Sequence, residues 1–173
     1  MKTLKLFVLA IAVITLSACS SDDDSSTPVV ELTNANLAGT YELIFFEDFY
    51  ERSETASDGS AVIIETETCV GDTFTNAILT LNTDGTFVTS GNFREVCQLT
   101  INSQTTSDES IVTFDSSGSF TANDSSRTIS ISGVINDVTV FDGTNLYLTS
   151  EEVDTNGSET ERYETEVRFR KQN

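Results

Sequence analysis

The sequence predicts an all-β domain in which about eight antiparallel strands form an up-and-down barrel, with a β-sandwich as the alternative. Three observations support this prediction. From Gly39 onward, apolar residues tend to recur at every second position, and Thr, Val, Ile and Phe dominate, as is typical of strands. Short groups of Gly, Asn and Asp separate the apolar stretches. The chain's one proline, Pro28, precedes this region, so no proline interrupts a strand.

The predicted strands follow one another with short connections. They cover residues 40–50, 61–69, 75–81, 86–99, 110–114, 128–135, 146–153 and 162–171; an extension of the fifth to residue 120, a further stretch at 138–141 and a helical turn at 31–38 are also compatible with the sequence. Asp84-Gly85 lies between two alternating stretches and is a strong hairpin signal. Because strands joined by short turns usually pair with their neighbours, we expect an antiparallel meander. Closure into a barrel would bury its apolar face and remove its free edges.

Alternation within the strands assigns one set of side chains to the interior. This inward set comprises Ala77, Leu79, Leu81, Phe87, Phe93, Ile129, Ile131, Ile135, Leu146, Leu148, Tyr163, Val167 and Phe169. On the last strand, Arg162, Arg168 and Arg170 fall on the opposite, outward side.

The first 18 residues are predicted to be a signal peptide. Lys2 and Lys5 give a basic start, and residues 6–16 form an uncharged, mainly apolar stretch. This stretch is shorter than the ~20 apolar residues that a membrane-spanning helix needs. Leu16-Ser17-Ala18-Cys19 resembles the lipobox of bacterial lipoproteins, in which the cysteine is acylated and becomes the first residue after cleavage. An ordinary signal peptide with a nearby cysteine is the alternative.

Cys19 is therefore the predicted lipid anchor, and the membrane is a predicted partner through that lipid. Residues 19–36 are expected to form the lipidated cysteine and a flexible acidic tether, and residues 37–173 the barrel domain. The run Cys-Ser-Ser-Asp-Asp-Asp that starts at Cys19 looks like the acidic export signal of surface-exposed Bacteroidetes lipoproteins. We therefore expect an outer-membrane lipoprotein at the cell surface, with a periplasm-facing location as the alternative.

The charge balance and the missing residue types exclude several classes of function. Removal of Lys2 and Lys5 with the signal leaves seven of nine basic residues against 28 acidic ones, a formal charge of −21. Nucleic acid is not an expected partner, because its binding requires basic groups that neutralise phosphates. The chain has no His, the usual general base near neutral pH and the commonest metal ligand. We expect no enzymatic activity, no catalytic residues, no metal and no cofactor.

The two remaining cysteines, Cys69 and Cys97, are predicted to form a disulfide. An even pair in an exported protein favours oxidation to one bridge. A redox-active pair is the alternative, but it lacks the Cys-x-x-Cys spacing.

Three motifs resemble the lipocalin-like lipoproteins of Bacteroidetes. Residues 37–43, Leu-Ala-Gly-Thr-Tyr-Glu-Leu, look like that family's entry into its first strand, Leu-x-Gly-x-Trp-x-Leu. Residues 79–87 are similar to its third-to-fourth hairpin, and residues 163–171 to its closing strand. Tyr41 stands where the family usually has tryptophan. In the family this aromatic plugs the closed end of the barrel, often under a basic side chain from the last strand, for which Arg168 and Arg170 are the candidates.

The resemblance implies a barrel with one open mouth and a small apolar ligand inside. The candidate cavity residues are Tyr41, Leu43, Phe45, Leu79, Phe87, Phe93, Ile131, Leu148, Tyr163 and Phe169. Plain core packing is the alternative role for them, because eight-stranded barrels can be filled by side chains. The expected function is that of a membrane-anchored, lipocalin-like binding protein for a small apolar ligand in the bacterial envelope. The alternative is a structural or protein- or glycan-interaction domain with an envelope partner, recognisable by an exposed aromatic patch around Phe46 and Phe141.

Overall fold

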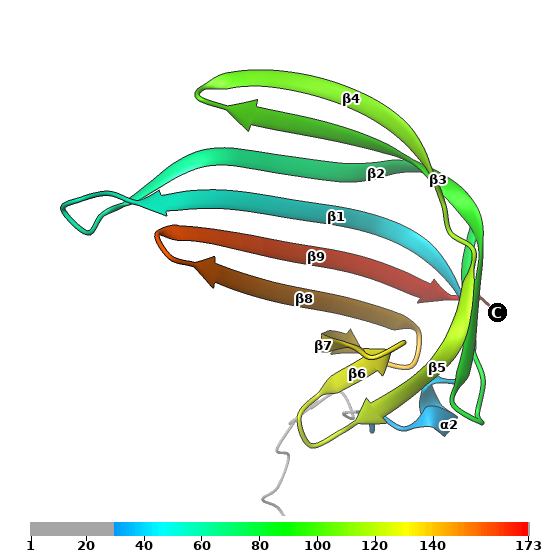
Figure 1. Ribbon diagram of the computed structural model, residues 1–173. Coiled ribbons are helices and arrows are strands. Elements are labelled where there is room, and N and C mark those ends of the chain that lie inside the picture. The colour runs from blue at the N-terminus through cyan, green and yellow to red at the C-terminus, as the bar shows by residue number, and fades with distance from the viewer. Residues whose placement is uncertain (1–29, 173) are drawn as a thin grey trace, which may run out of the picture.

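The computed structural model describes residues 30–172, which form one antiparallel sheet and a short helix (Figure 1). The elements are α2 (Asn34–Leu37), β1 (Gly39–Thr55), β2 (Ala61–Leu81), β3 (Thr86–Ile101), β4 (Gln104–Thr113), β5 (Ser116–Asn123), β6 (Thr128–Ile131), β7 (Val134–Phe141), β8 (Asn145–Asn156) and β9 (Glu159–Lys171). Among these residues, no helix has the length and the apolar character needed to cross a membrane. The predicted signal peptide, Cys19 and the tether up to residue 29 lie outside the described residues.

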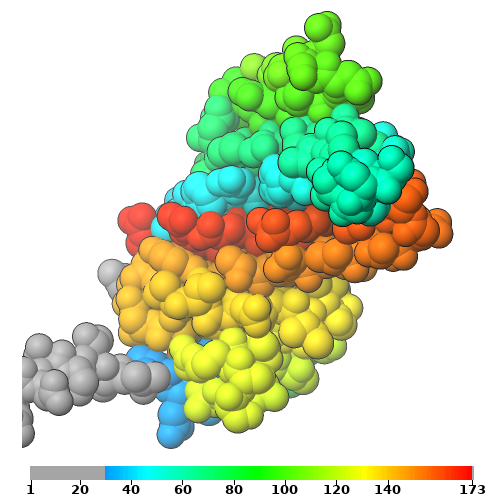
Figure 2. Space-filling view, turned by 90° about the vertical axis from the view of Figure 1, so that its left-hand side faces the viewer, coloured from blue at the N-terminus to red at the C-terminus, as the bar shows by residue number. Residues whose placement is uncertain are grey.

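The sheet closes into a ring in which each strand pairs with the next along the chain, except that β3 pairs with β5 and β4 lies outside the ring; this confirms the predicted up-and-down barrel. The strand order is β2-β1-β9-β8-β7-β6-β5-β3-β4, and an additional pairing of β2 with β3 closes the ring. Every pairing is antiparallel. The last strand therefore lies beside the first. Figure 2 shows this as red β9 between cyan β1 and orange β8.

The ring is complete only at one end of the molecule, at the lower right in Figure 1, which we call the lower half; the long strands run from it to the left, into what we call the upper half. Residues 86–89 of β3 pair with β5, whereas residues 92–101 pair with β4. On the other side, β7 pairs with residues 146–149 of β8. Above that point β8 pairs with β9 alone among the described residues, and β4 pairs with β3 alone. The long strands thus continue from a closed barrel into an open, curved six-stranded sheet (Figure 1).

The hydrophobic core lies in the closed lower half. Buried side chains come from the lower parts of most strands of the ring and from the N-terminal segment. They include Leu37, Tyr41, Leu43, Ala77, Leu79, Leu81, Phe87, Phe93, Phe120, Ile129, Leu146, Leu148 and Phe169. Most of the predicted inward set is therefore buried, because alternation sorts apolar and polar residues to opposite faces.

The folded domain begins before residue 37, the start expected from the sequence. Leu32 is 2% exposed and belongs to the core, and its amide donates a hydrogen bond to Asp124 Oδ1 (2.7 Å). Thr33 caps α2 by accepting a hydrogen bond from the Asn36 amide. Residues 30–36 thus cover the closed end of the barrel, because burial of Leu32 and Leu37 requires them to lie against it.

Three strand predictions were wrong in detail. The stretch predicted at 110–114 is the end of a longer strand, β4, and its suggested extension to residue 120 belongs to a separate strand, β5. The stretches predicted at 61–69 and 75–81 are parts of one strand, β2, which continues through two irregularities in its register with β3. The stretch predicted at 128–135 is divided by a turn at Ser132 and Gly133, both with positive φ. That turn reverses the alternation, so Ile135 pairs with Ser130, faces outward and is 67% exposed, contrary to the expectation that it is buried.

A bulge in β1 changes which of its side chains face inward, so the predicted faces of this strand are wrong beyond that point. The register with β9 shifts between Leu43 and Phe45, which adds one residue to β1 at this point. Leu43 is buried, and the next inward side chain is Phe46, which packs against the core. Phe45 faces outward, contrary to its predicted place in the cavity. Above the bulge, the inward positions of β1 are the even-numbered ones.

The predicted disulfide is confirmed. Cys69 on β2 and Cys97 on β3 are directly paired, and their sulfur atoms are bonded. The bridge lies on the inner face of the open sheet, just above the closed barrel.

Gly91 marks the height at which β3 changes from one neighbour to the other. It has a φ of +99°, and its carbonyl accepts a hydrogen bond from the Phe114 amide (2.9 Å) at the junction of β4 and β5. A Cβ atom at this position would come within 2.7 Å of the Ala77 amide and closer still to the Asn76 carbonyl. A side chain would therefore collide with the backbone of the bulged part of β2.

Gly91→Ala should lower the free energy of unfolding by at least about 3 kcal/mol, because backbone strain and steric overlap add. Gly143→Ala is the matched control: its φ is +88°, but a Cβ atom there would enter open space, so only the conformational cost of about 1–2 kcal/mol applies. Urea unfolding followed by circular dichroism measures both. Equal losses in the two variants would contradict the close packing at Gly91.

Candidate functional site

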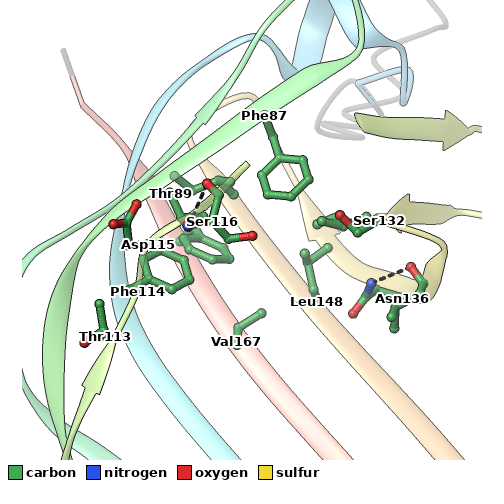
Figure 3. Close-up of a pocket in the computed structure, with 14 residues that line it drawn as sticks. Phe87, Thr89, Thr113, Phe114, Asp115, Ser116, Ser132, Asn136, Leu148 and Val167 are labelled. Carbon is green, nitrogen blue, oxygen red and sulfur yellow. Dashed lines mark hydrogen bonds between the residues drawn. The ribbon is translucent and has the colours of Figure 1, made fainter. Parts of the chain in front are cut away.

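An apolar cavity of about 370 Å³ opens at the upper end of the closed barrel. Figure 3 shows side chains of Phe87, Phe114, Leu148 and Val167, from different segments, around one space. The full lining is Leu79, Phe87, Thr89, Thr113, Phe114, Asp115, Ser116, Ile131, Ser132, Val134, Asn136, Leu148, Val167 and Phe169. Its walls are thus mainly aliphatic and aromatic, with polar groups from β3, from the junction of β4 and β5 and from the β6–β7 hairpin.

The structure brings half of the ten predicted cavity residues together at this site. Leu79, Phe87, Ile131, Leu148 and Phe169 line the cavity, and they come from five different strands. Alternation placed all five on the inward face. Their convergence requires ring closure, because β2 and β9 are joined only through β1 and through the other strands of the ring.

Three further predicted residues belong to the core rather than to the cavity lining. Tyr41 is fully buried, Leu43 is 1% exposed and Phe93 is 2% exposed. Phe93 lies 4.9 Å from Phe46 and 5.8 Å from Phe74, measured between ring centroids. This aromatic cluster fills the space beside the cavity.

The last two predicted residues lie elsewhere. Phe45 is on the outer face, with the Arg168 guanidinium 4.3 Å from its ring centroid. Tyr163 is on the inner face but above the closed barrel. It is 44% exposed there, and its ring centroid lies 4.9 Å from that of Tyr50. The exposed aromatic patch expected around Phe46 and Phe141 is absent, because Phe141 is 6% exposed and Phe46 packs against the core.

Tyr41 closes the lower end of the barrel by joining it to the helix. Its hydroxyl donates a buried hydrogen bond to the Leu37 carbonyl (2.7 Å). Burial raises the pKa of Tyr41 to about 12, so the hydroxyl stays protonated and able to donate at neutral pH.

The basic residue above Tyr41 is Lys171, not Arg168 or Arg170. Its Nζ lies 5.5 Å from the Tyr41 ring centroid and donates a hydrogen bond to the Ala38 carbonyl (2.7 Å). The lack of a side chain at Gly39 gives Lys171 room to cross the backbone there. Lys171 was not among the predicted residues, although its position in β9 is odd-numbered, like the positions of the inward-facing residues of that strand.

Several lining residues were not among the predicted site residues. Phe114 lies in the break between β4 and β5 and stacks on Phe169, with ring centroids 6.4 Å apart. Thr89 is buried and joins β3 to the start of β5, because its hydroxyl accepts a hydrogen bond from the Ser116 amide (2.8 Å). Asn136 donates to the Val134 carbonyl (3.1 Å). Phe114 ends the predicted strand at 110–114 without an assignment to either face, and in the structure the strand is interrupted there.

Above the cavity, the inner face of the open sheet becomes acidic. Directly paired residues share a face, so the pairings define four successive rows across six strands. Each row takes one residue from β8, β9, β1, β2, β3 and β4, in that order. The two rows nearest the cavity are Leu148–Val167–Phe46–Gly71–Glu95–Ser110 and, above it, Ser150–Thr165–Asp48–Cys69–Cys97–Asp108. The third row is Glu152–Tyr163–Tyr50–Glu67–Leu99–Thr106, and the fourth is Asp154–Glu161–Arg52–Glu65–Ile101–Gln104. We call the carboxylates of these rows the acidic wall: Asp48, Glu65, Glu67, Glu95, Asp108, Glu152, Asp154 and Glu161.

The acidic wall begins in the same row as two cavity residues, Leu148 and Val167. Glu95 is that row's carboxylate. Burial raises its pKa, and the nearby carboxylates of Asp48 and Glu67 contribute to the rise. The cationic side chain of the four rows, Arg52, is bound to Glu65 (2.6 Å) and to Glu159 (3.1 Å) at the upper end of the wall.

One cluster has the spacing of metal ligands. Potential ligand atoms of Glu67, Cys69 and Cys97 lie within 4.8 Å of one another. Because the two sulfur atoms are bonded to each other, neither is a thiolate that can ligate a metal.

Comparison with known proteins yields little for this chain. Neither a family model nor a curated protein matches the sequence. Among solved structures, Ail, the attachment invasion locus protein of Yersinia pestis, is similar at 5% sequence identity and a TM-score of 0.24, over 78% of this chain and 99% of that chain. A score this low supports no conclusion about function, which has to come from the geometry of the barrel.

Tyr41→Phe should reduce the free energy of unfolding by about 1–2 kcal/mol, because it leaves the buried Leu37 carbonyl without this donor. Tyr163→Phe is the matched control, since it removes the same atom from an exposed side chain and should change stability by no more than about 0.5 kcal/mol. Chemical unfolding measures both variants. A Tyr41→Phe variant as stable as the wild type would refute the proposed role of this hydroxyl in the plug.

Proposed function

We propose that this chain is a lipid-anchored envelope protein whose barrel binds a small, largely apolar molecule. The observation that carries the proposal is the apolar cavity at the mouth of the closed barrel. Its volume of about 370 Å³ falls within the range of small-molecule sites, roughly 300–1,000 Å³.

The chemistry of the lining supports an apolar ligand. Phe87, Phe114 and Phe169 offer large aromatic surfaces, and Leu148 and Val167 extend the apolar wall. Each CH₂ group transferred from water to such a surface contributes about 0.8 kcal/mol. Because the closed end is filled by Tyr41 and Leu37, the ligand enters from the side of the open sheet.

Attachment to the membrane is proposed from the sequence. A basic start, a short apolar stretch and the lipobox-like residues before Cys19 indicate export followed by acylation. Acyl chains on Cys19 would hold the barrel at the outer membrane, at the cell surface or facing the periplasm. The resemblance to the lipocalin-like lipoproteins of Bacteroidetes agrees with both parts of the proposal. An interaction domain is the alternative function, but the exposed aromatic patch expected for it around Phe46 and Phe141 is absent.

Binding is tested with N-phenyl-1-naphthylamine, an uncharged apolar dye that becomes fluorescent in apolar surroundings. We expect a saturable increase in fluorescence with one dye per chain. Because the chain contains no Trp, the signal is free of tryptophan emission. Val167→Phe narrows the cavity and should weaken binding at least about tenfold, equivalent to about 1.4 kcal/mol.

Val153→Phe provides the matched control. Val153 lies on β8, outside the cavity lining, and is 54% exposed. The same substitution there should leave dye binding unchanged. Absence of saturable uptake by the wild type, or equal binding by the wild type and Val167→Phe, would reject the cavity as a ligand site.

A further inference from the structure

We propose that the ligand is a cationic amphiphile, with its apolar end in the cavity and its positive group against the acidic wall. This inference rests on the proposed function and adds the chemical class of the ligand. It follows from three features of the inner face: the lining has no basic side chain, carboxylates begin at the cavity's own height, and two tyrosines lie among them.

The cavity gives an anionic head group no cationic partner. Its lining contains no Lys or Arg, and the sequence has no His. The lining's ionisable side chain is the carboxyl of Asp115. A carboxylate or phosphate brought to this mouth would lose water without gaining a counter-charge, which is costly near low-dielectric walls.

The first carboxylates lie where a ligand's head group would emerge. Glu95 belongs to the row of Leu148 and Val167, and Asp48 to the next row. One row corresponds to about 7 Å along a strand. A ligand whose apolar part fills the cavity would therefore bring its other end to the height of these two groups, and Asp48 lies on β1, the strand that pairs with the β9 strand of Val167.

The carboxylates nearest the mouth are available to a cation. Arg52, the cationic side chain of the four rows, lies two rows above Asp48 and is bound to Glu65 and Glu159. Arg94 lies on the opposite face of β3 from Glu95, where it pairs with Asp72 and Glu109. Neither arginine therefore neutralises Glu95 or Asp48.

Two aromatic rings add a second kind of cation site. Tyr50 and Tyr163 lie side by side in the third row, with ring centroids 4.9 Å apart. Both hydroxyl groups donate hydrogen bonds to Glu161. Aromatic faces attract ammonium groups, by about 0.5–2 kcal/mol depending on solvent exposure.

The test compares three linear probes of ten carbons each: decylamine, which is cationic at pH 7, uncharged 1-decanol and anionic decanoate. Each probe competes with N-phenyl-1-naphthylamine for the purified full chain carrying Cys19→Ala, so that no acyl group occupies the cavity. We expect decylamine to bind at least tenfold more tightly than decanoate, with decanol between them. At about 1 M salt, where the Debye length falls to about 3 Å, the difference should narrow.

A pair of double variants separates the acidic wall from the net charge of the chain. Asp48→Asn with Glu95→Gln should reduce the preference for decylamine over decanoate at least threefold and leave decanol binding unchanged. Glu47→Gln with Glu51→Gln removes the same charge from the outer face of the same part of the sheet and should leave the preference intact. The salt dependence in the wild type tests the same electrostatic preference if the first variant does not fold.

The outcomes distinguish the two proposals. If the dye shows no saturable binding, the proposed function fails together with this inference; if the dye binds but decylamine does not displace it, this inference alone fails. If decanol binds and decanoate binds as tightly as decylamine, the barrel is a ligand-binding module but the cationic preference is overturned. A preference that is equally reduced by the two double variants would also overturn it, because the wall would then act only through net charge.

Discussion

The pairing of β1 with β9 is the interaction on which the rest of the structure depends. It joins the start of the domain to its end and turns a meander into a ring. Without it, the apolar sides of β2 and β8 would not face one another across a common interior. The closure is reinforced at its lower end, where Lys171 of β9 contacts the Ala38 carbonyl and lies over Tyr41 of β1. Tyr41 in turn holds α2 through the Leu37 carbonyl. Closure and plug are therefore one connected set of contacts.

The pairing of β1 with β9 has different consequences in the closed barrel and in the open sheet. In the lower half, eight strands surround side chains that exclude water, and the side chains leave a cavity at the mouth. In the upper half, β4 and β8 are the two edges of an open sheet, and the inner face meets solvent. The bulge in β1 links the halves. By turning Phe45 outward, it brings Phe46 into the core and Asp48 and Tyr50 onto the inner face.

Much of the barrel was predictable from alternation because its strands separate apolar from polar residues. Leu146, Leu148 and Phe169 were assigned to the interior from period-two spacing alone, and they are buried. Alternation failed where the backbone departs from a regular strand. Phe45 follows a bulge, and Ile135 follows a turn. The ladder partners that fix such irregularities are remote in sequence, so a local pattern does not reveal them.

The candidate site was predictable only in part for the same reason. The apolar half of the cavity lies on regular strands, whereas Phe114 lies in a strand break. The acidic wall was hidden because its β1 member, Asp48, shares the face of Phe46 only after the bulge, and because its rows form across six strands. Lys171 was overlooked in favour of the two arginines beside it, although its odd position agreed with the inward residues of β9.

Hydrogen exchange at individual backbone amides, followed by NMR, tests the closure most directly. We expect amides in the lower β1–β9 ladder, within residues 41–46 and 167–171, to exchange only through global unfolding. Amides on the free edges of β4 and of β8 above residue 150 should exchange far faster, because they have no strand partner. Fast exchange throughout the β1–β9 ladder would mean that the ring is open in solution, and the cavity and the acidic wall would then lack their common frame.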